Sequence, residues 1–214
     1  MPGELLLDAD QSPPPFFDVT YFKFRFYFEE HDPLVQQEMH YIEWDLNGCG
    51  SMGQEPYTCH HNELDIVAGA GSSAGPDIQV LQSTFPAFGM LMPWCGPMSG
   101  GSCMDQSKVG PKGFKLILAA THCHAPNCLR QELINADTNE TLCVGTPVHG
   151  NSSEVFDEKG YLYTPPCTWG EGAGFTDPPV LHPSTTLRMV VYYNSTYGHP
   201  GQMGIWQMKA ALVV

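Results

Sequence analysis

Residues 121–128 read THCHAPNC, a stretch whose residue types can bind a metal or form a disulfide. The strand predicted from Gly113 onward alternates its side chains between two faces, which places His122 and His124 on the same face as Phe114 and Leu116. Two imidazoles at that spacing can chelate one metal ion, and a rigid strand lowers the entropy cost of assembling them. Two half-exposed histidines at the end of a sheet are the alternative reading.

A metal site needs a third ligand, and the segment YNSTYGHPGQMGIWQM offers His199, Met203 and Met208. A thioether is a soft ligand that suits copper, so two histidines and one methionine would favour Cu(I) or Cu(II). The alternative for Met203 is a core methionine at the start of a strand. Cys123 is a further ligand only if it is reduced.

The cysteines and the sequons point to an oxidising compartment. The eight cysteines are even in number and none has the CxxC spacing of a structural zinc site, which favours four disulfides. Three N-glycosylation sequons begin at Asn139, Asn151 and Asn194. We therefore expect an extracellular, secreted glycoprotein that carries N-linked glycans. The cysteines are Cys49, Cys59, Cys95, Cys103, Cys123, Cys128, Cys143 and Cys167.

Charge and hydropathy exclude two classes of partner. The 214 residues include 9 Lys and Arg against 23 Asp and Glu, for a formal net charge of -14. Such a surface repels phosphate backbones, so no nucleic acid is expected to bind. No apolar stretch approaches the roughly 20 residues of a membrane span. The start, MPGELLLDADQS, lacks the features of a signal peptide, and we expect a mature or partial polypeptide.

The elements that must position these residues are strands, because the strong apolar patterns have a period of two. In residues 16–30, phenylalanines alternate with charged residues and predict a half-buried strand with an aromatic inner face. Residues 129–145 predict a hairpin that turns near residues 137–140. Further strands are predicted within residues 39–46, 63–71, 77–85, 113–125, 161–167, 185–194 and 203–214.

Eight or nine strands with no helical pattern imply an all-β fold, an antiparallel β-sandwich with long disulfide-linked loops. Residues 1–15 are expected to form an extended N-terminal tail that ends in three prolines, and residues 16–214 a single sandwich domain. Residues 86–112 are rich in Gly, Pro, Met and Cys and predict a long loop.

Three stretches carry a family resemblance: ATHCHAPNCLRQELINADTNETLCVGTPVHG, FDEKGYLYTPPCTWG and YYNSTYGHPGQMGIWQM. From about residue 113 to residue 214 the chain resembles the C-terminal domain of the copper type II, ascorbate-dependent monooxygenases. Peptidylglycine hydroxylating monooxygenase and dopamine β-monooxygenase are members, and the chain looks most like divergent plant and algal members of the stress-upregulated nodulin type. The resemblance implies a jelly-roll-like sandwich and copper on His122, His124 and Met203. It also implies hydroxylation of a C–H bond, with ascorbate as the reductant.

The chain departs from that family in its first half. The family's partner domain carries a second, electron-supplying copper on three histidines, and residues 1–112 leave little room for such a domain. His60 and His61 resemble the adjacent histidines of that second site, but their loop, YTCHHNELD, is polar. Two exposed loop histidines are the alternative. His60, His61 and His199 are therefore weaker candidate ligands.

Proximity in the sequence and the pattern of the family suggest one disulfide pairing out of the 105 that eight cysteines allow. The suggested pairs are Cys143–Cys167, Cys123–Cys128, Cys49–Cys59 and Cys95–Cys103.

Two functions from different classes stay open. The first is an extracellular copper-binding monooxygenase domain whose reductant or partner domain comes from elsewhere. The alternative is a non-catalytic extracellular structural module that self-assembles with other copies, as a filament or matrix, through its N-terminal tail. That tail has leucines at positions 5–7 before a Pro-rich spacer, and it could add a strand to an exposed sheet edge.

Overall fold

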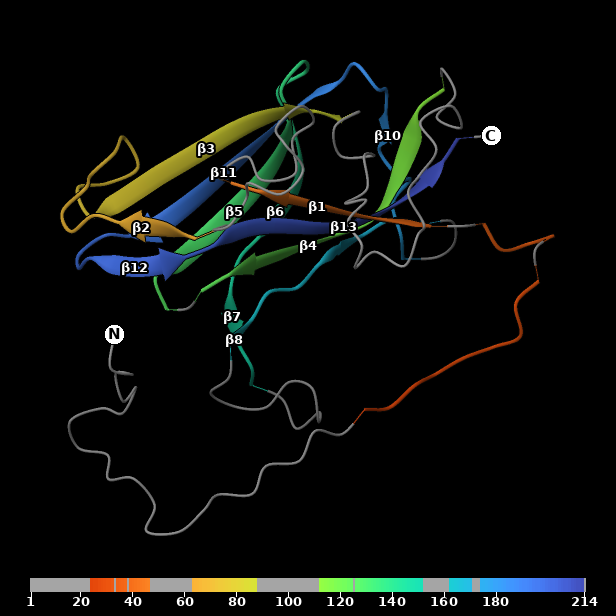
Figure 1. Ribbon diagram of the computed structural model, residues 1–214, viewed down its shortest axis with the longest axis horizontal. Helices are drawn as coiled ribbons and strands as arrows, with labels where there is room; N and C mark the ends of the chain where they lie inside the picture. The colour runs from red at the N-terminus through yellow and green to blue at the C-terminus, as the bar shows by residue number, and fades with distance from the viewer. Residues whose placement is uncertain are drawn as a thin grey trace, which may run out of the picture. The chain divides into compact units, whose positions relative to one another are not determined.

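The computed structural model describes most of the chain from residue 24 onward and divides it into two units, Met1–Gln36 and Gln37–Val214. Every strand among the described residues belongs to the second unit, and Figure 1 shows their arrangement. The described residues are 24–32, 34–37, 39–46, 63–87, 112–124, 126–151, 162–170 and 174–213.

Within the described residues, thirteen strands form two large antiparallel sheets and two small ones. The five-stranded sheet contains, in order, β1 (His40–Asp45), β13 (Gly204–Leu212), β4 (Phe114–Cys123) and β10 (Val180–Leu181), and β9 (Cys167–Thr168) also pairs with β4. The four-stranded sheet contains β3 (Ile78–Pro86), β11 (Thr186–Asn194), β5 (Cys128–Asn135) and β6 (Glu140–Gly145). The two-stranded sheets are β12 (His199–Gln202) with β2 (Leu64–Ile66), and β7 (Val148–His149) with β8 (Leu162–Tyr163).

The two large sheets pack face to face around one hydrophobic core. On β11, every second residue is fully buried, which is the alternation expected of a strand with one face in a core. Trp44 of β1 stacks on Phe85 of β3 with ring centroids 3.8 Å apart, so aromatic side chains from both sheets meet directly. The prediction of an all-β antiparallel sandwich is confirmed. The fully buried β11 residues are Leu187, Met189, Val191 and Tyr193.

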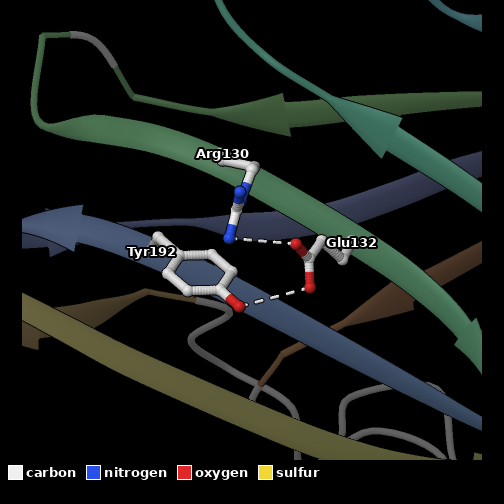
Figure 2. Close-up of polar contacts among 3 residues, drawn as sticks. All are labelled: Arg130, Glu132 and Tyr192. Carbon is white, nitrogen blue, oxygen red and sulfur yellow. Dashed lines mark hydrogen bonds and ion pairs between the residues drawn. The ribbon is translucent and has the colours of Figure 1, made fainter. Parts of the chain in front are cut away.

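The outer face of the four-stranded sheet carries a polar cluster of three residues (Figure 2). The Arg130 guanidinium lies 4.1 Å from the centroid of the Tyr192 ring and forms an ion pair with Glu132 at 3.0 Å. The Tyr192 hydroxyl donates a hydrogen bond of 3.2 Å to Glu132. Partly exposed contacts of this kind contribute little stability each, so the cluster mainly marks which face of β5 and β11 points to solvent.

The predicted hairpin is confirmed, since β5 and β6 pair and the chain turns between them. The Asn135 side chain accepts hydrogen bonds from the backbone N–H groups of Asp137 and Thr138, which stabilises the turn. Asn139, the first residue of a sequon, has φ 58°, a left-handed conformation that asparagine tolerates better than most residues.

A β-bulge on β4 changes which side chains face the core. Lys209 pairs with Leu118 and the next residue, Ala210, pairs with Leu116, so Ile117 is an extra residue on β4. An extra residue reverses the alternation beyond it. Phe114 and Leu116 are buried before the bulge, but after it Ala119 is buried instead of Leu118. The expectation that His122 and His124 share a face with Phe114 is therefore wrong.

The prediction of a half-buried aromatic strand is wrong for residues 24–30. These residues contain no strand, and Phe24, Phe26 and Phe28 are 75%, 81% and 95% exposed. Alternation of apolar and charged residues creates two faces, but a strand also needs a neighbouring strand for its backbone groups. The sequence of residues 24–30 has the alternation, but among the described residues no neighbouring strand pairs with it.

We expect Phe85→Ala to destabilise the protein by about 3–5 kcal/mol, because it removes a buried ring and leaves a cavity beside Trp44. Phe26→Ala is the matched control at an exposed phenylalanine and should change the free energy of unfolding by less than about 0.5 kcal/mol. Urea unfolding of both variants measures the difference. Equal effects would contradict this packing of the two sheets.

Candidate metal site

The histidine pair lies at the C-terminal end of β4. The rings of His122 and His124 have centroids 5.6 Å apart and meet edge to face at 79°. A metal ion held about 2.1 Å from a ring nitrogen lies roughly 3 Å from that ring's centroid, so two rings at this separation can share one ion. His122 is exposed and His124 is half-buried, so the pair is accessible from solvent.

The pairing of β4 with β13 brings Met203 towards the histidines. The last pair of this ladder is Cys123 with Gly204, so the next residues outward are His124 and Met203. Cys123 packs against the core, and a Cβ on Gly204 would also point into it, towards Tyr193 and Val191. Alternation along extended chains then puts His122, His124 and Met203 on the opposite, outer side. The donor set of two imidazoles and one thioether suits copper.

Each of these three residues has its backbone carbonyl held by a hydrogen bond. The Gln131 side-chain amide donates to the His122 carbonyl at 2.9 Å. The Tyr193 hydroxyl donates to the Met203 carbonyl, also at 2.9 Å. The His124 carbonyl accepts from the backbone N–H of Cys128 at 3.2 Å. The backbone that carries the three side chains is therefore fixed from three directions.

Two disulfides form among the described residues, one at the end of β4 and one beside its middle. Cys123 bonds to Cys128 and closes the short loop that follows His124. Cys143 of β6 bonds to Cys167 of β9, which pairs with β4, so this bridge ties the two large sheets together. Both pairs were predicted and are confirmed. The other four predicted disulfide cysteines, Cys49, Cys59, Cys95 and Cys103, lie outside the described residues.

Asp45 is a buried carboxyl in the same row of the sheet as His122. Ile205 pairs with both residues, Asp45 on one side and His122 on the other. Strands lie about 4.8 Å apart, so roughly 10 Å separates the two backbones, and Asp45 does not form a metal-binding group with the two histidines. Burial, followed by the neighbouring Glu43 carboxylate, raises the Asp45 pKa to about 7. One of its buried oxygens makes no hydrogen bond with the described residues.

The weaker candidate ligands do not complete the site. His199 begins β12 and pairs with Ile66 of β2, a strand of a different sheet. Within the described residues, no three His, Cys, Asp or Glu side chains form a group that could hold a metal ion. His199 therefore does not join the histidine pair as a third donor. His60 and His61 lie outside the described residues.

The three sequon asparagines, Asn139, Asn151 and Asn194, are all exposed. The Asn194 side-chain oxygen accepts hydrogen bonds from both the backbone N–H and the hydroxyl of Thr196, at 2.9 Å and 2.7 Å. A glycan attached at any of these positions would not displace a core side chain.

Sequence reasoning missed Gln131, Tyr193 and Asp45. Each is polar, or has a polar tip, and each lies in a strand that is otherwise apolar on its buried positions. A buried polar group normally requires a hydrogen-bond partner, and that rule marks such positions in a sequence. It does not name the partner, because the partner of Gln131 lies on the opposite sheet and that of Tyr193 in the segment between β12 and β13.

No protein family, curated protein or solved structure matches the chain in comparisons of its sequence and fold. In the part of the chain that the structure describes, no helix is long and apolar enough to cross a membrane.

The raised pKa of Asp45 predicts a pH-dependent loss of stability. The folded pKa of about 7 lies above the unfolded value of about 3.9, so the folded state holds a proton that the unfolded state releases. Stability from this group is therefore complete below about pH 4 and is lost as the pH rises to about 7. Asp45→Asn should gain on the order of 1 kcal/mol relative to wild type between pH 4 and pH 8.

Urea unfolding at pH 4, 6 and 8 measures this gain. Asp177→Asn, at an exposed carboxylate, is the control and should show no such change. A difference between Asp45→Asn and wild type that stays constant across the three pH values would contradict the assignment.

Proposed function

We propose that this chain is an extracellular copper-binding domain in which His122, His124 and Met203 hold one ion. The observation that carries the proposal is the edge-to-face histidine pair, whose rings are 5.6 Å apart on a rigid strand. The same ligand set is implied by the resemblance to the C-terminal domain of the copper type II monooxygenases. The jelly-roll-like arrangement of strands that the resemblance implies belongs to this proposal as well.

The chemistry of the residues supports copper over harder ions. Imidazole suits copper, zinc, iron and nickel, but a thioether selects for copper among them. Copper at this position would supply one-electron redox chemistry, and in the enzymatic form of the proposal ascorbate is its reductant. The protein's own contribution is to hold the donors on a strand end that faces solvent, where a substrate with an oxidisable C–H bond or a partner domain can approach.

The disulfides and the sequons indicate the compartment in which the protein resides. Disulfides persist in oxidising environments, and the two that border the site fix the segment that carries the histidines. The sequons at Asn139, Asn151 and Asn194 are exposed and open to glycan attachment. We infer that the protein is a secreted glycoprotein.

The copper proposal predicts one equivalent of copper per chain. His122→Ala and His124→Ala should each weaken copper binding by more than about 100-fold, because loss of a direct ligand costs more than loss of a residue that only orients one. Met203→Leu should weaken Cu(I) binding more than Cu(II) binding, because the thioether is the soft donor. Competition titrations with chromophoric chelators measure both oxidation states.

The control is His149→Ala, which removes an exposed histidine of β7 and should leave the affinity unchanged. Copper binding that survives the loss of both His122 and His124 would defeat the proposal.

A second function is a non-catalytic structural module that self-assembles. The N-terminal tail predicted to mediate it, residues 1–15, lies outside the described residues, and a neighbouring segment favours this function. Phe24, Phe26 and Phe28 are exposed in the unit that precedes the sandwich. Exposed aromatic side chains in series are typical of interaction surfaces, and an extended segment can add a strand to a sheet edge. Other copies of the chain, associated as a filament or matrix, are the partners in this reading.

Self-association through this segment predicts that a Phe24→Ser, Phe26→Ser, Phe28→Ser variant is monomeric at concentrations where wild type associates. Sedimentation velocity across a concentration series measures the mass of the particles. Tyr197→Ser, which removes a 73% exposed aromatic residue elsewhere, is the control and should behave as wild type. A wild-type protein that stays monomeric throughout would remove the second function.

A further inference from the structure

We propose that Tyr193 and Gln131 are positioning residues for the copper site and that they act from the opposite sheet, through the backbone carbonyls of Met203 and His122. This inference rests on the proposed function. It adds to that function two residues that contact the backbone of the ligand residues. One acts on the residue that supplies the thioether and the other on a residue that supplies an imidazole.

Tyr193 reaches across the sandwich from β11. Its ring is fully buried on the inner face of the four-stranded sheet, and its hydroxyl donates to the Met203 carbonyl at 2.9 Å. Burial raises the pKa of this hydroxyl above its usual range. The bond fixes the residue that joins β12 to β13, which is where Met203 lies.

Gly204 explains how the tyrosine comes so close to the backbone. A Cβ at position 204 would lie 2.9 Å from the Tyr193 hydroxyl oxygen and 3.1 Å from a methyl group of Val191. Contacts of that length require the neighbours to move, and neither neighbour has room in a packed core. The close approach of β13 to β11 therefore depends on glycine at this position.

Gln131 holds the backbone of His122 in the same way. It is fully buried on β5, and its amide nitrogen donates to the His122 carbonyl at 2.9 Å. Its own side-chain oxygen is buried and makes no hydrogen bond with the described residues. A buried oxygen without a hydrogen bond costs free energy, which an apolar residue of the same size would avoid. The bond to His122 is the one favourable polar contact that this side chain makes in the described structure.

The two bonds prepare the site for a metal ion before it binds. A ligand set that is already held in place loses less conformational freedom on binding, and outer residues that orient metal ligands typically change affinity by about 10–100-fold. Tyr193 holds the backbone of the residue that supplies the thioether, and Gln131 holds the backbone of a residue that supplies an imidazole. Loss of each should therefore change copper binding in a different way.

The test compares Tyr193→Phe and Gln131→Met with two matched controls in the full chain. Tyr192→Phe removes a hydroxyl hydrogen bond from the outer face of the same strand, and Gln207→Met removes an amide that donates to Glu43 on the solvent side of β13. The measurements are Cu(I) and Cu(II) affinity by chelator competition and X-ray absorption of the Cu(I) form. Near-ultraviolet circular dichroism confirms that each variant is folded at the temperature used.

We expect Tyr193→Phe to weaken Cu(I) binding by about 10–100-fold and to reduce the copper–sulfur contribution to the absorption spectrum. Gln131→Met should weaken both oxidation states and keep the copper–sulfur contribution. The controls should stay within about twofold of wild type, because Tyr192 and Gln207 hydrogen-bond to Glu132 and Glu43 and not to a ligand residue. Gly204→Ala keeps the tyrosine but displaces it, and it should reproduce Tyr193→Phe, which keeps the test decisive if that variant does not fold.

The outcomes separate this inference from the function it rests on. If wild type binds copper through His122, His124 and Met203 but Tyr193→Phe, Gly204→Ala and Gln131→Met bind it equally well, the positioning role is wrong and the copper site stands. If wild type binds no copper, or binds it independently of the two histidines, both are wrong.

Discussion

The bulge at Ile117 is the constraint on which the rest of this structure depends. Before it, β4 buries Phe114 and Leu116, and after it the strand buries Ala119 and packs Cys123 against the core. One extra residue thus turns the histidines outward and the cysteine inward. Without the bulge, His122 and His124 would point into the apolar core, where burial would oppose their charged forms.

The site is coupled to the core through polar contacts. Gln131 and Tyr193 belong to the four-stranded sheet, whereas the carbonyls they hold belong to the C-terminal end of β4 in the five-stranded sheet and to the segment between β12 and β13. The Cys143–Cys167 bridge joins the same two layers near the middle of β4. A shift of one sheet against the other would therefore move the backbone of the histidines and of Met203 together.

The sequence predicted those features that depend on local alternation and short spacing. The fold class, most strands and the β5–β6 hairpin follow from patterns within a few tens of residues, whereas the two disulfides were suggested by proximity together with the pattern of the resembled family. The bulge does not, because Ile117 is extra only relative to its partner strand, β13. The exposed phenylalanines show the opposite failure, since the alternation is present at residues 24–30 but no strand forms there. The roles of Gln131 and Tyr193 were not predicted from the sequence, because their hydrogen-bond partners lie across the sandwich.

The Cys123–Cys128 bridge sets an order of events for the chain. Its two sulfur atoms join only where thiols are oxidised, and the loop that follows His124 is open until they do. A newly made chain in a reducing compartment holds its histidines on a strand end that is not yet closed. Under the proposal of a secreted copper protein, closure of this loop coincides with passage out of the reducing compartment, and metal loading follows both.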